Sequence, residues 1–267
     1  MPRYRLDIAY DGTPFSGWQR QDHSPSVQQA IEEAIEGFAG ATQKETIRLH
    51  AAGRTDAGVH AEGQVAHVDL VRDWDAGVVR RATNANLLRA EAPIAIRSCT
   101  LVDNAFHARF SATARHYRYR ILDRDWPPTT RRHVVWWVPT RRPLDVDAMG
   151  EAAARLLGRH DFTTFRAAQC QADSPVRTLD RLIVQRQDEE IVLYASARSF
   201  LHHQVRSMTG ALKRVGEGRW TPNDVSAALE ARDRARCPAM APSSGLCLIG
   251  VDYPPDDRTD AESEIAV

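Results

Sequence analysis

The sequence lacks the features of a secreted or membrane-bound protein. It has four cysteines and no Cys-x-x-Cys pair, so neither a zinc ribbon nor a disulfide framework is indicated. No apolar run approaches the roughly 20 residues that span a bilayer. The first residues, MPRYRLDIAYD, contain no long apolar stretch of the kind found in a signal peptide. We therefore expect a cytoplasmic protein whose cysteines stay reduced.

Lysine is almost absent. Only Lys44 and Lys213 occur among 35 basic residues, and all the others are arginines. Acidic residues also number 35, so the net charge alone indicates no polyanionic partner. The codon bias of a GC-rich genome would produce this composition, but arginine is also well suited to gripping phosphate and stacking on bases. Because the basic residues concentrate in 109–120, 131–142 and 198–214, a neutral chain can still carry a basic groove.

The first hundred residues alternate between strand and helix patterns. Polar and apolar residues alternate over 5–10, which predicts a strand, and apolar residues at helical spacing predict a helix over 27–38. Similar patterns predict strands at 47–52, 64–70 and 94–102 and a helix at 78–88. The order of strand, helix, two strands, helix and strand is that of a ferredoxin-like unit, a framework that many RNA-binding sheets share.

The pattern then begins again. Strands are predicted at 116–122, 133–138, 177–187, 191–197 and 247–253, and helices at 146–157, 202–215 and 222–231. We therefore predict an α+β fold with two ferredoxin-like, or RRM-like, halves, 1–105 and 106–253. Together they would form an extended, mostly antiparallel sheet with helices on one face and an RNA-binding cleft on the other. The acidic tail 254–267 is expected to be disordered.

One loop carries the pattern of a catalytic site. The segment 51–60 reads AAGRTDAGVH and places Asp56 on a glycine-flanked loop between two predicted strands. Arg54, two residues earlier, is able to pair with this carboxylate and orient it. For an isolated loop, an aspartate that merely caps a turn is the simpler interpretation. A phosphate-binding P-loop is excluded, because Val59 and His60 stand where that motif requires Lys and Ser or Thr.

Six segments together resemble one family. GRTDAGVH at 53–60 is similar to the catalytic loop of the tRNA pseudouridine synthase A (TruA) family. YDGTPFSGWQRQ at 10–21 resembles that family's first strand and turn, and FHARFSATARHYRY at 106–119 resembles its central arginine and tyrosine segment. DFTTFR at 161–166, FLHHQVRSM at 200–208 and APSSGL at 241–246 match further blocks in the same order. By this resemblance the chain is identified as a member of the family.

The resemblance implies an isomerase that converts uridine to pseudouridine near positions 38 to 40 of the tRNA anticodon stem-loop, with no metal or other cofactor. Asp56 would act as nucleophile or general base. Arg54 and Arg206 would pair with Asp56 and contact phosphates, while Tyr117 would stack on the uracil and Leu246 would form an apolar wall against it. The resemblance also implies a homodimer whose subunits share one tRNA.

Each assignment has an alternative. Tyr117 could be an ordinary strand residue, Arg206 a solvated surface charge and Leu246 a core side chain. The chain could also be a non-catalytic RNA-binding protein on the same scaffold, or a metal-dependent hydrolase that uses Asp56 and nearby histidines. If the histidine pair at 202–203 lay on a helix, its rings would point about 100° apart and could not easily share a metal ion. We therefore expect no metal site, and leave RNA contact and packing open for this pair.

Overall fold

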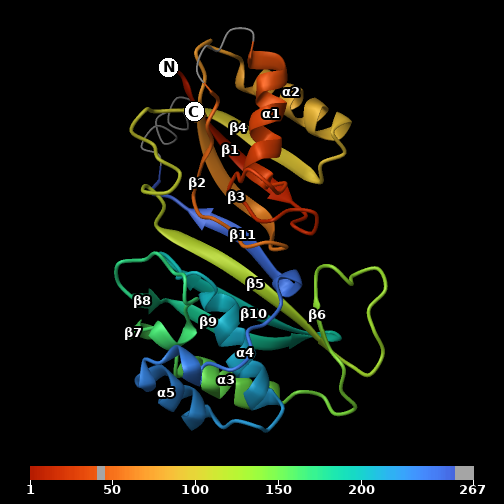
Figure 1. Cartoon of the computed structure of the whole chain (residues 1–267), viewed down its shortest axis with the longest axis vertical. Coiled ribbons are helices and arrows are strands. Elements are labelled where there is room, and N and C mark those ends of the chain that lie inside the picture. The colour runs from red at the N-terminus through yellow and green to blue at the C-terminus, as the bar shows by residue number, and fades with distance from the viewer. Residues whose placement is uncertain (41–45, 256–267) are drawn as a thin grey trace, which may run out of the picture.

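A computed structural model describes residues 1–40 and 46–255 of the protein (Figure 1). Nine strands form one large sheet: β1 (Arg3–Tyr10), β2 (His50–Ala51), β3 (His60–Asp69), β4 (Ile94–Val102), β5 (Ala114–Asp123), β6 (Trp136–Val138), β9 (Arg181–Gln187), β10 (Glu190–Ala197) and β11 (Leu246–Asp252). Their order is β4-β1-β3-β11-β5-β10-β9, with β2 beside β3 and β6 beside β5. Among these described strands, only the β11–β3 and β5–β6 pairs are parallel. The expected α+β class with a mostly antiparallel sheet is confirmed.

Two groups of helices cover the two ends of this sheet. Helices α1 (Val27–Ala39) and α2 (Ala76–Arg89) pack near β1 and β4, at the top of Figure 1. Helices α3 (Val146–Ala154), α4 (Gln204–Gly216) and α5 (Pro222–Ala231) lie at the other end, below β9 and β10. A short second sheet pairs β7 (Gly158–Asp161) with β8 (Val176–Leu179). None of the helices in the described ranges has the length and apolar character needed to cross a bilayer.

The buried apolar residues form two large cores, one at each end. One contains residues from β1, α1 and α2, and the other contains residues from β10, α3 and α4. Strand β11 contributes to both, because Leu246 belongs to the second core and Leu248 to the first. Alternate residues of a strand face the same side of a sheet, so one strand face can serve two neighbouring cores. β11 therefore forms the seam of the molecule.

Several helix starts follow directly from the sequence. Ser26 caps α1, since its hydroxyl accepts a hydrogen bond from the Gln29 amide at 3.3 Å. Thr221 and Asp224 form a reciprocal capping box at the start of α5, with Pro222 as the first helical residue. Such caps satisfy amides that have no partner within the helix. Both the α5 bounds and the β4 bounds agree with the sequence prediction.

The structure differs from the sequence prediction at several elements. The strand at 47–52 is reduced to two residues, and the strand at 177–187 is divided at Asp180 between β8 and β9, which belong to different sheets. Strand β7 was missed because its four residues, GRHD, have no apolar alternation. The helix predicted from His202 begins at Gln204, because His203 takes a left-handed φ of 66° that no helix allows. The tail from 256 onward lies outside the described residues.

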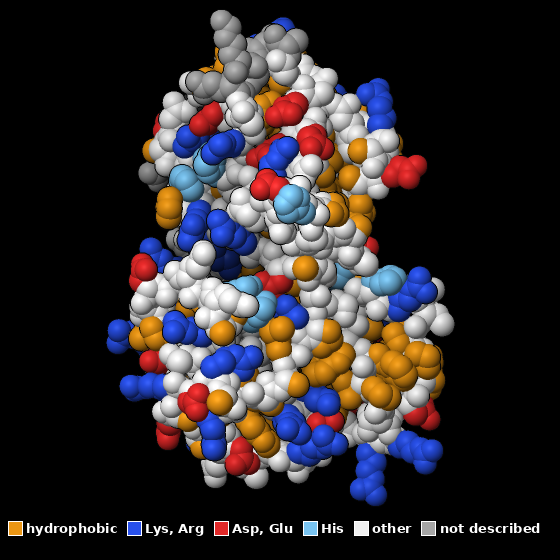
Figure 2. Space-filling view, in the orientation of Figure 1, with side chains coloured by type: hydrophobic (Ala, Val, Ile, Leu, Met, Phe, Trp, Pro, Cys, Tyr) orange, Lys and Arg blue, Asp and Glu red, His pale blue; other side chains and the backbone are white. Residues whose placement is uncertain are grey.

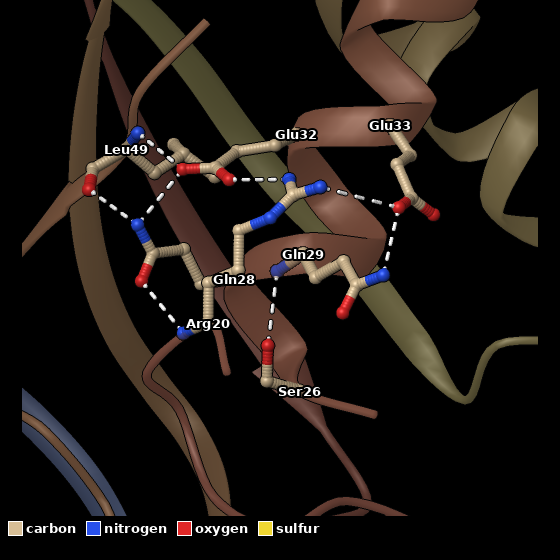
Figure 3. Close-up of polar contacts among 7 residues, drawn as sticks. All are labelled: Arg20, Ser26, Gln28, Gln29, Glu32, Glu33 and Leu49. Carbon is tan, nitrogen blue, oxygen red and sulfur yellow. Dashed lines mark hydrogen bonds and ion pairs between the residues drawn. The ribbon is translucent and has the colours of Figure 1, made fainter. Parts of the chain in front are cut away.

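A buried carboxylate ties α1 to the segment before β2 (Figure 3). Glu32, only 2% exposed, accepts hydrogen bonds from the Leu49 amide at 3.0 Å and from the Gln28 side-chain amide at 2.8 Å. Arg20 donates to its other oxygen at 3.0 Å. Burial of a charge is costly unless it is paired and hydrogen-bonded. The three donors provide this pairing and hydrogen bonding for Glu32. The network fixes the path of the chain toward the loop that carries Asp56.

Candidate active site

A cavity of about 1140 Å³ is lined by residues from both halves of the chain. All five residues singled out from the sequence line it: Arg54, Asp56, Tyr117, Arg206 and Leu246. Among the described residues of its lining, Asp56 is the only acidic side chain, whereas six are arginines. Figure 2 shows Lys and Arg side chains gathered beside histidines in the hollow at the waist of the molecule. The cavity is therefore an electropositive space with one carboxylate in it.

The loop that carries Asp56 is held by the turn after β1. Thr55, the preceding residue, accepts a hydrogen bond from the Trp18 amide at 3.0 Å on its carbonyl oxygen. Its hydroxyl lies 2.8 Å from that of Tyr10. Gly17 has a φ of 104°, and a Cβ there would stand 2.7 Å from the Thr55 carbonyl oxygen, so the close approach requires glycine. These contacts explain why two segments about 40 residues apart in sequence form one site.

Arg206, in the first turn of α4, is the closest cationic partner of Asp56. Its Nη1 donates to Asp56 Oδ2 at 2.8 Å, and its Nε donates to the Ala241 carbonyl oxygen at 2.9 Å. The guanidinium is thus fixed at two points, and both side chains are mostly buried. A charge-assisted hydrogen bond of this kind is short and strong. It holds the carboxylate in one orientation toward the cavity.

Arg54 does not play the part that its position in the sequence suggested. Its side chain is exposed, and the structure gives it no ion pair with Asp56 or with any other described acid. The reason is local: Thr55 turns inward to its hydrogen bonds, so the residue before it projects outward. The expectation that Arg54 orients the carboxylate is wrong in this structure. Arg54 lines the cavity as an unpaired cation.

Two histidines also face the carboxylate. His202 Nε2 lies 3.3 Å from Asp56 Oδ1, and His203 Nε2 lies 3.4 Å from Asp56 Oδ2. The sequence analysis missed this contact because it placed both residues on a helix, whereas they precede α4 and His203 is its left-handed cap. Their ring centroids are 3.9 Å apart. Burial lowers the pKa of His203, although the charge of Asp56 opposes this shift, so the neutral imidazole is favoured.

The same three residues have the chemistry of a metal site. The ligand atoms of Asp56, His202 and His203 lie within 4.8 Å of one another, and a carboxylate with two imidazoles is a donor set that zinc accepts. The helical argument against a shared ion therefore fails. A different argument opposes a cation here, because the Arg206 guanidinium already occupies one oxygen of the carboxylate. The absence of a metal ion from this site stays a prediction, and it depends on the positive charge of Arg206.

Tyr117 and Leu246 come from adjacent strands, β5 and β11. Tyr117 is paired in register with Leu248 of β11, and its ring meets that of Phe200 edge to face at 5.2 Å. Burial, and next the negative charge of Asp56, raise the pKa of Tyr117, so its phenol stays protonated. Leu246 is buried at the start of β11 and closes the apolar side of the cavity. The two side chains provide a ring and an aliphatic surface near the carboxylate.

Arg115 connects the segments that surround the cavity. Its Nη2 donates to the carbonyl oxygens of Ala52 at 2.7 Å and Arg109 at 2.8 Å, and its Nη1 donates to that of Arg198 at 2.6 Å. Burial lowers the pKa of Arg115. The sequence placed Arg115 in the arginine and tyrosine segment at 106–119. It could not predict which carbonyl groups Arg115 contacts, because every residue has a backbone carbonyl.

Comparisons with known proteins show what this chain is similar to. A family model described as "tRNA pseudouridine synthase" matches residues 8–111 and 152–254. A protein of Mesorhizobium japonicum named "tRNA pseudouridine synthase A" is 63% identical over 254 residues, which cover 95% of this chain and 100% of the relative. A protein of Brucella ovis with the same name is 58% identical over 253 residues, covering 95% and 98%. A chain from a solved Cbf5–Nop10–Gar1 complex aligns with 79% of this chain and 54% of its own length at 10% identity, with a TM-score of 0.32, which is too low to support an argument.

Proposed function

The chain belongs to the tRNA pseudouridine synthase family, whose members are isomerases, and on that premise we propose that it isomerises uridine near positions 38 to 40 of the tRNA anticodon stem-loop. One observation supports the chemistry above all others. Asp56 is the only acidic side chain among the described residues of an arginine-lined cavity, and Arg206 holds it in place at 2.8 Å. A lone, oriented carboxylate facing a cationic space fits a reaction on a nucleotide.

The reaction needs few groups from the protein. The bond from C1′ to N1 breaks, the uracil rotates while it is held, and a bond from C1′ to C5 forms. The hydrogen at C5 then leaves as a proton and N1 takes up a proton, so the product is an isomer of the substrate. Asp56 would begin this sequence by covalent addition or by abstraction of a proton, and both routes need a carboxylate near the extruded nucleotide. Arg206 keeps that carboxylate in position, and the two histidines at 3.3 and 3.4 Å pack against its oxygens.

Tyr117 and Leu246 would hold the uracil. Stacking on an aromatic ring contributes about 1 to 3 kcal/mol per base, and extrusion from a helix costs a few kcal/mol. Since the two quantities are comparable, a pocket with one aromatic and one aliphatic wall can retain an extruded base. Phe200 supports the Tyr117 ring edge to face at 5.2 Å. Arg54, exposed and unpaired at the same cavity, would contact a phosphate rather than the carboxylate.

The finer organisation of the protein is also a proposal. We infer two ferredoxin-like halves, 1–105 and 106–253, whose shared sheet carries helices on one face and the RNA-binding cleft on the other. The two large apolar cores, each drawn mainly from one half, support this division. From the family resemblance we further infer a cytoplasmic homodimer that shares one tRNA between its subunits. Size-exclusion chromatography with light scattering, with and without tRNA, tests the dimer, and a monomer in both conditions would refute it.

Release of tritium tests the enzymatic proposal directly. Unmodified tRNA labelled at C5 of uridine should release label into water with the wild-type protein, because the C5 hydrogen is displaced. Asp56→Asn should reduce the release rate by at least about 1,000-fold, because it removes the group that begins the reaction. Binding of tRNA should persist. If Asp56→Asn were as active as the wild type, the assignment of Asp56 would be wrong. If the wild type bound tRNA but released no label, the protein would be a non-catalytic RNA-binding protein.

A further inference from the structure

The loop between β4 and β5 exposes an aromatic ring at the edge of the same cavity. Phe110 is 71% exposed, lines the cavity and belongs to neither of the two large apolar cores. Its ring centroid lies 4.4 Å from that of His107 at an interplanar angle of 38°. The guanidinium carbon of Arg109 lies 5.6 Å from the same centroid. An aromatic ring backed by an imidazole, beside a cation, is the combination on which unpaired bases stack.

This loop is held rigidly even though its aromatic ring is exposed. Nδ1 of His107 accepts hydrogen bonds from the amides of Arg109 at 3.1 Å and Phe110 at 3.4 Å. The Ala108 amide donates to Nδ1 of buried His67 at 3.2 Å. The carbonyl of Arg109 accepts from Arg115 at 2.8 Å. Because the backbone is fixed before any ligand arrives, binding to Phe110 would cost little ordering of the loop.

The surrounding charges favour a polyanion. Arg48 and Arg109 line the cavity near this loop, and both are exposed. In the described ranges neither forms an ion pair with an acid, whereas other arginines such as Arg3 and Arg186 do. His50 also lines the cavity, with its ring centroid 5.8 Å from that of His107. Unpaired arginines beside an exposed ring match the alternating phosphates and bases of a single strand.

We propose that Phe110, supported by His107, is a stacking platform for a second nucleotide of the tRNA, one that flanks the uridine held at Asp56, and that Arg109 contacts its phosphate. This inference depends on the proposed function for the identity of the RNA. The cavity of about 1140 Å³ exceeds the roughly 300 to 1,000 Å³ of most small-ligand pockets. A cavity of this size has room for a neighbour of the target nucleotide as well as for the target itself.

Binding of an anticodon stem-loop RNA tests the platform in the Asp56→Asn background, where no turnover intervenes. Phe110→Ala should weaken binding roughly 5- to 100-fold, as expected for the loss of one base stack. Phe110→Tyr and Phe110→Trp should restore binding to within about 2-fold, since both keep an aromatic face. Leu88→Ala is the matched control, because Leu88 is 79% exposed on α2 and does not line the cavity, and its affinity should be unchanged.

Three further measurements separate stacking from a general loss of structure. A 2-aminopurine placed beside the target uridine should be quenched on binding, and Phe110→Ala should abolish the quenching. Arg109→Gln should lower the slope of log affinity against log salt by about one, as for one phosphate contact. Equal thermal melting temperatures would establish that the variants are folded.

The inference fails if Phe110→Ala binds the stem-loop as tightly as Asp56→Asn alone and quenches the probe equally. It also fails if Leu88→Ala weakens binding as much as Phe110→Ala does. These outcomes differ from a failure of the proposed function, in which the wild type would release no tritium from any tRNA. In that case the binding comparison at Phe110 would still show whether this ring stacks on RNA.

Discussion

Arg115 donates a hydrogen bond of 2.7 Å to the carbonyl oxygen of Ala52, the residue just before the loop of Asp56. The same guanidinium also donates to the carbonyl oxygens of Arg109, Ala112 and Arg198. Arg115→Lys, which offers a compact ammonium, should therefore leave at least one buried carbonyl unpaired. We expect unfolding free energy to fall by about 1 to 3 kcal/mol. Urea denaturation measures it. The control is Arg118→Lys, because Arg118 lies on the same strand and forms a surface ion pair with Glu62. This substitution should change the free energy of unfolding by less than about 0.5 kcal/mol. Equal losses in the two variants would contradict the role of Arg115.

Arg206 should matter for turnover more than for stability. Arg206→Ala removes the 2.8 Å contact to Asp56, and loss of a charge-assisted hydrogen bond of about 1.5 to 3 kcal/mol corresponds to a decrease in the tritium-release rate of roughly 10- to 150-fold. Arg206→Lys should recover only part of the rate, because lysine cannot bind Asp56 and the Ala241 carbonyl in the same forked geometry. The control, Arg219→Ala, changes an exposed arginine beyond α4. A wild-type rate for Arg206→Ala would refute the role.

Glu32 should be the strongest stability determinant of α1. Glu32→Ala leaves the buried Leu49 amide and the Gln28 amide without their acceptor, and we expect a loss of about 2 to 4 kcal/mol in chemical denaturation. Glu33→Ala, one residue along, removes an exposed carboxylate whose contact to Arg20 is 3.6 Å long. That change should cost under about 0.5 kcal/mol. If the two variants lost equal stability, burial of the Glu32 network would not be the cause.

His67 should make the protein sensitive to mild acid. Burial lowers the pKa of His67 from 6.5 to about 4, so between these values the unfolded chain binds a proton that the folded protein excludes. The stability from this residue is therefore complete above pH 6.5 and is lost as the pH falls toward 4, by up to about 3 kcal/mol. His67→Gln should flatten that part of the curve of unfolding free energy against pH. His23→Gln, at an exposed histidine, should leave it unchanged.

Removal of metal should have no effect on turnover. The Arg206 guanidinium opposes a cation at the Asp56 carboxylate, so prolonged dialysis against excess chelator should leave the rate of tritium release within about 20% of its starting value. A zinc-dependent enzyme treated in parallel serves as the control. A loss of activity that added zinc restored would assign Asp56, His202 and His203 to a metal site instead.

Periodic patterns in the sequence predicted most elements of the sheet and its helices. The alternation over β1 and the apolar spacing in α1 are local signals, and the structure has both elements. The two-residue β2 was overestimated because a buried strand and a buried coil share the same apolar residues. The division between β8 and β9 at Asp180 could not be predicted, because the residues on each side alternate as in a strand. The two strands nevertheless pair with different partners.

The site was predictable only in part. Motif resemblance brought Asp56, Tyr117, Arg206 and Leu246 to attention, and all four line one cavity. The histidines on the carboxylate were missed because a left-handed φ at a non-glycine residue has no sequence signal. The outward direction of Arg54 could not be predicted either, since it follows from hydrogen bonds that its neighbour makes with distant segments.

The position of β11 in the sheet has a consequence for biosynthesis. In the described sheet, β3 and β5 each pair with β11 and not with each other. Every other described strand precedes β11 in the sequence, so all of them are synthesised before β11 can pair with β3 and β5. Until then Leu246 is missing from the cavity wall. The cavity wall can therefore be completed only after every other described strand has been synthesised.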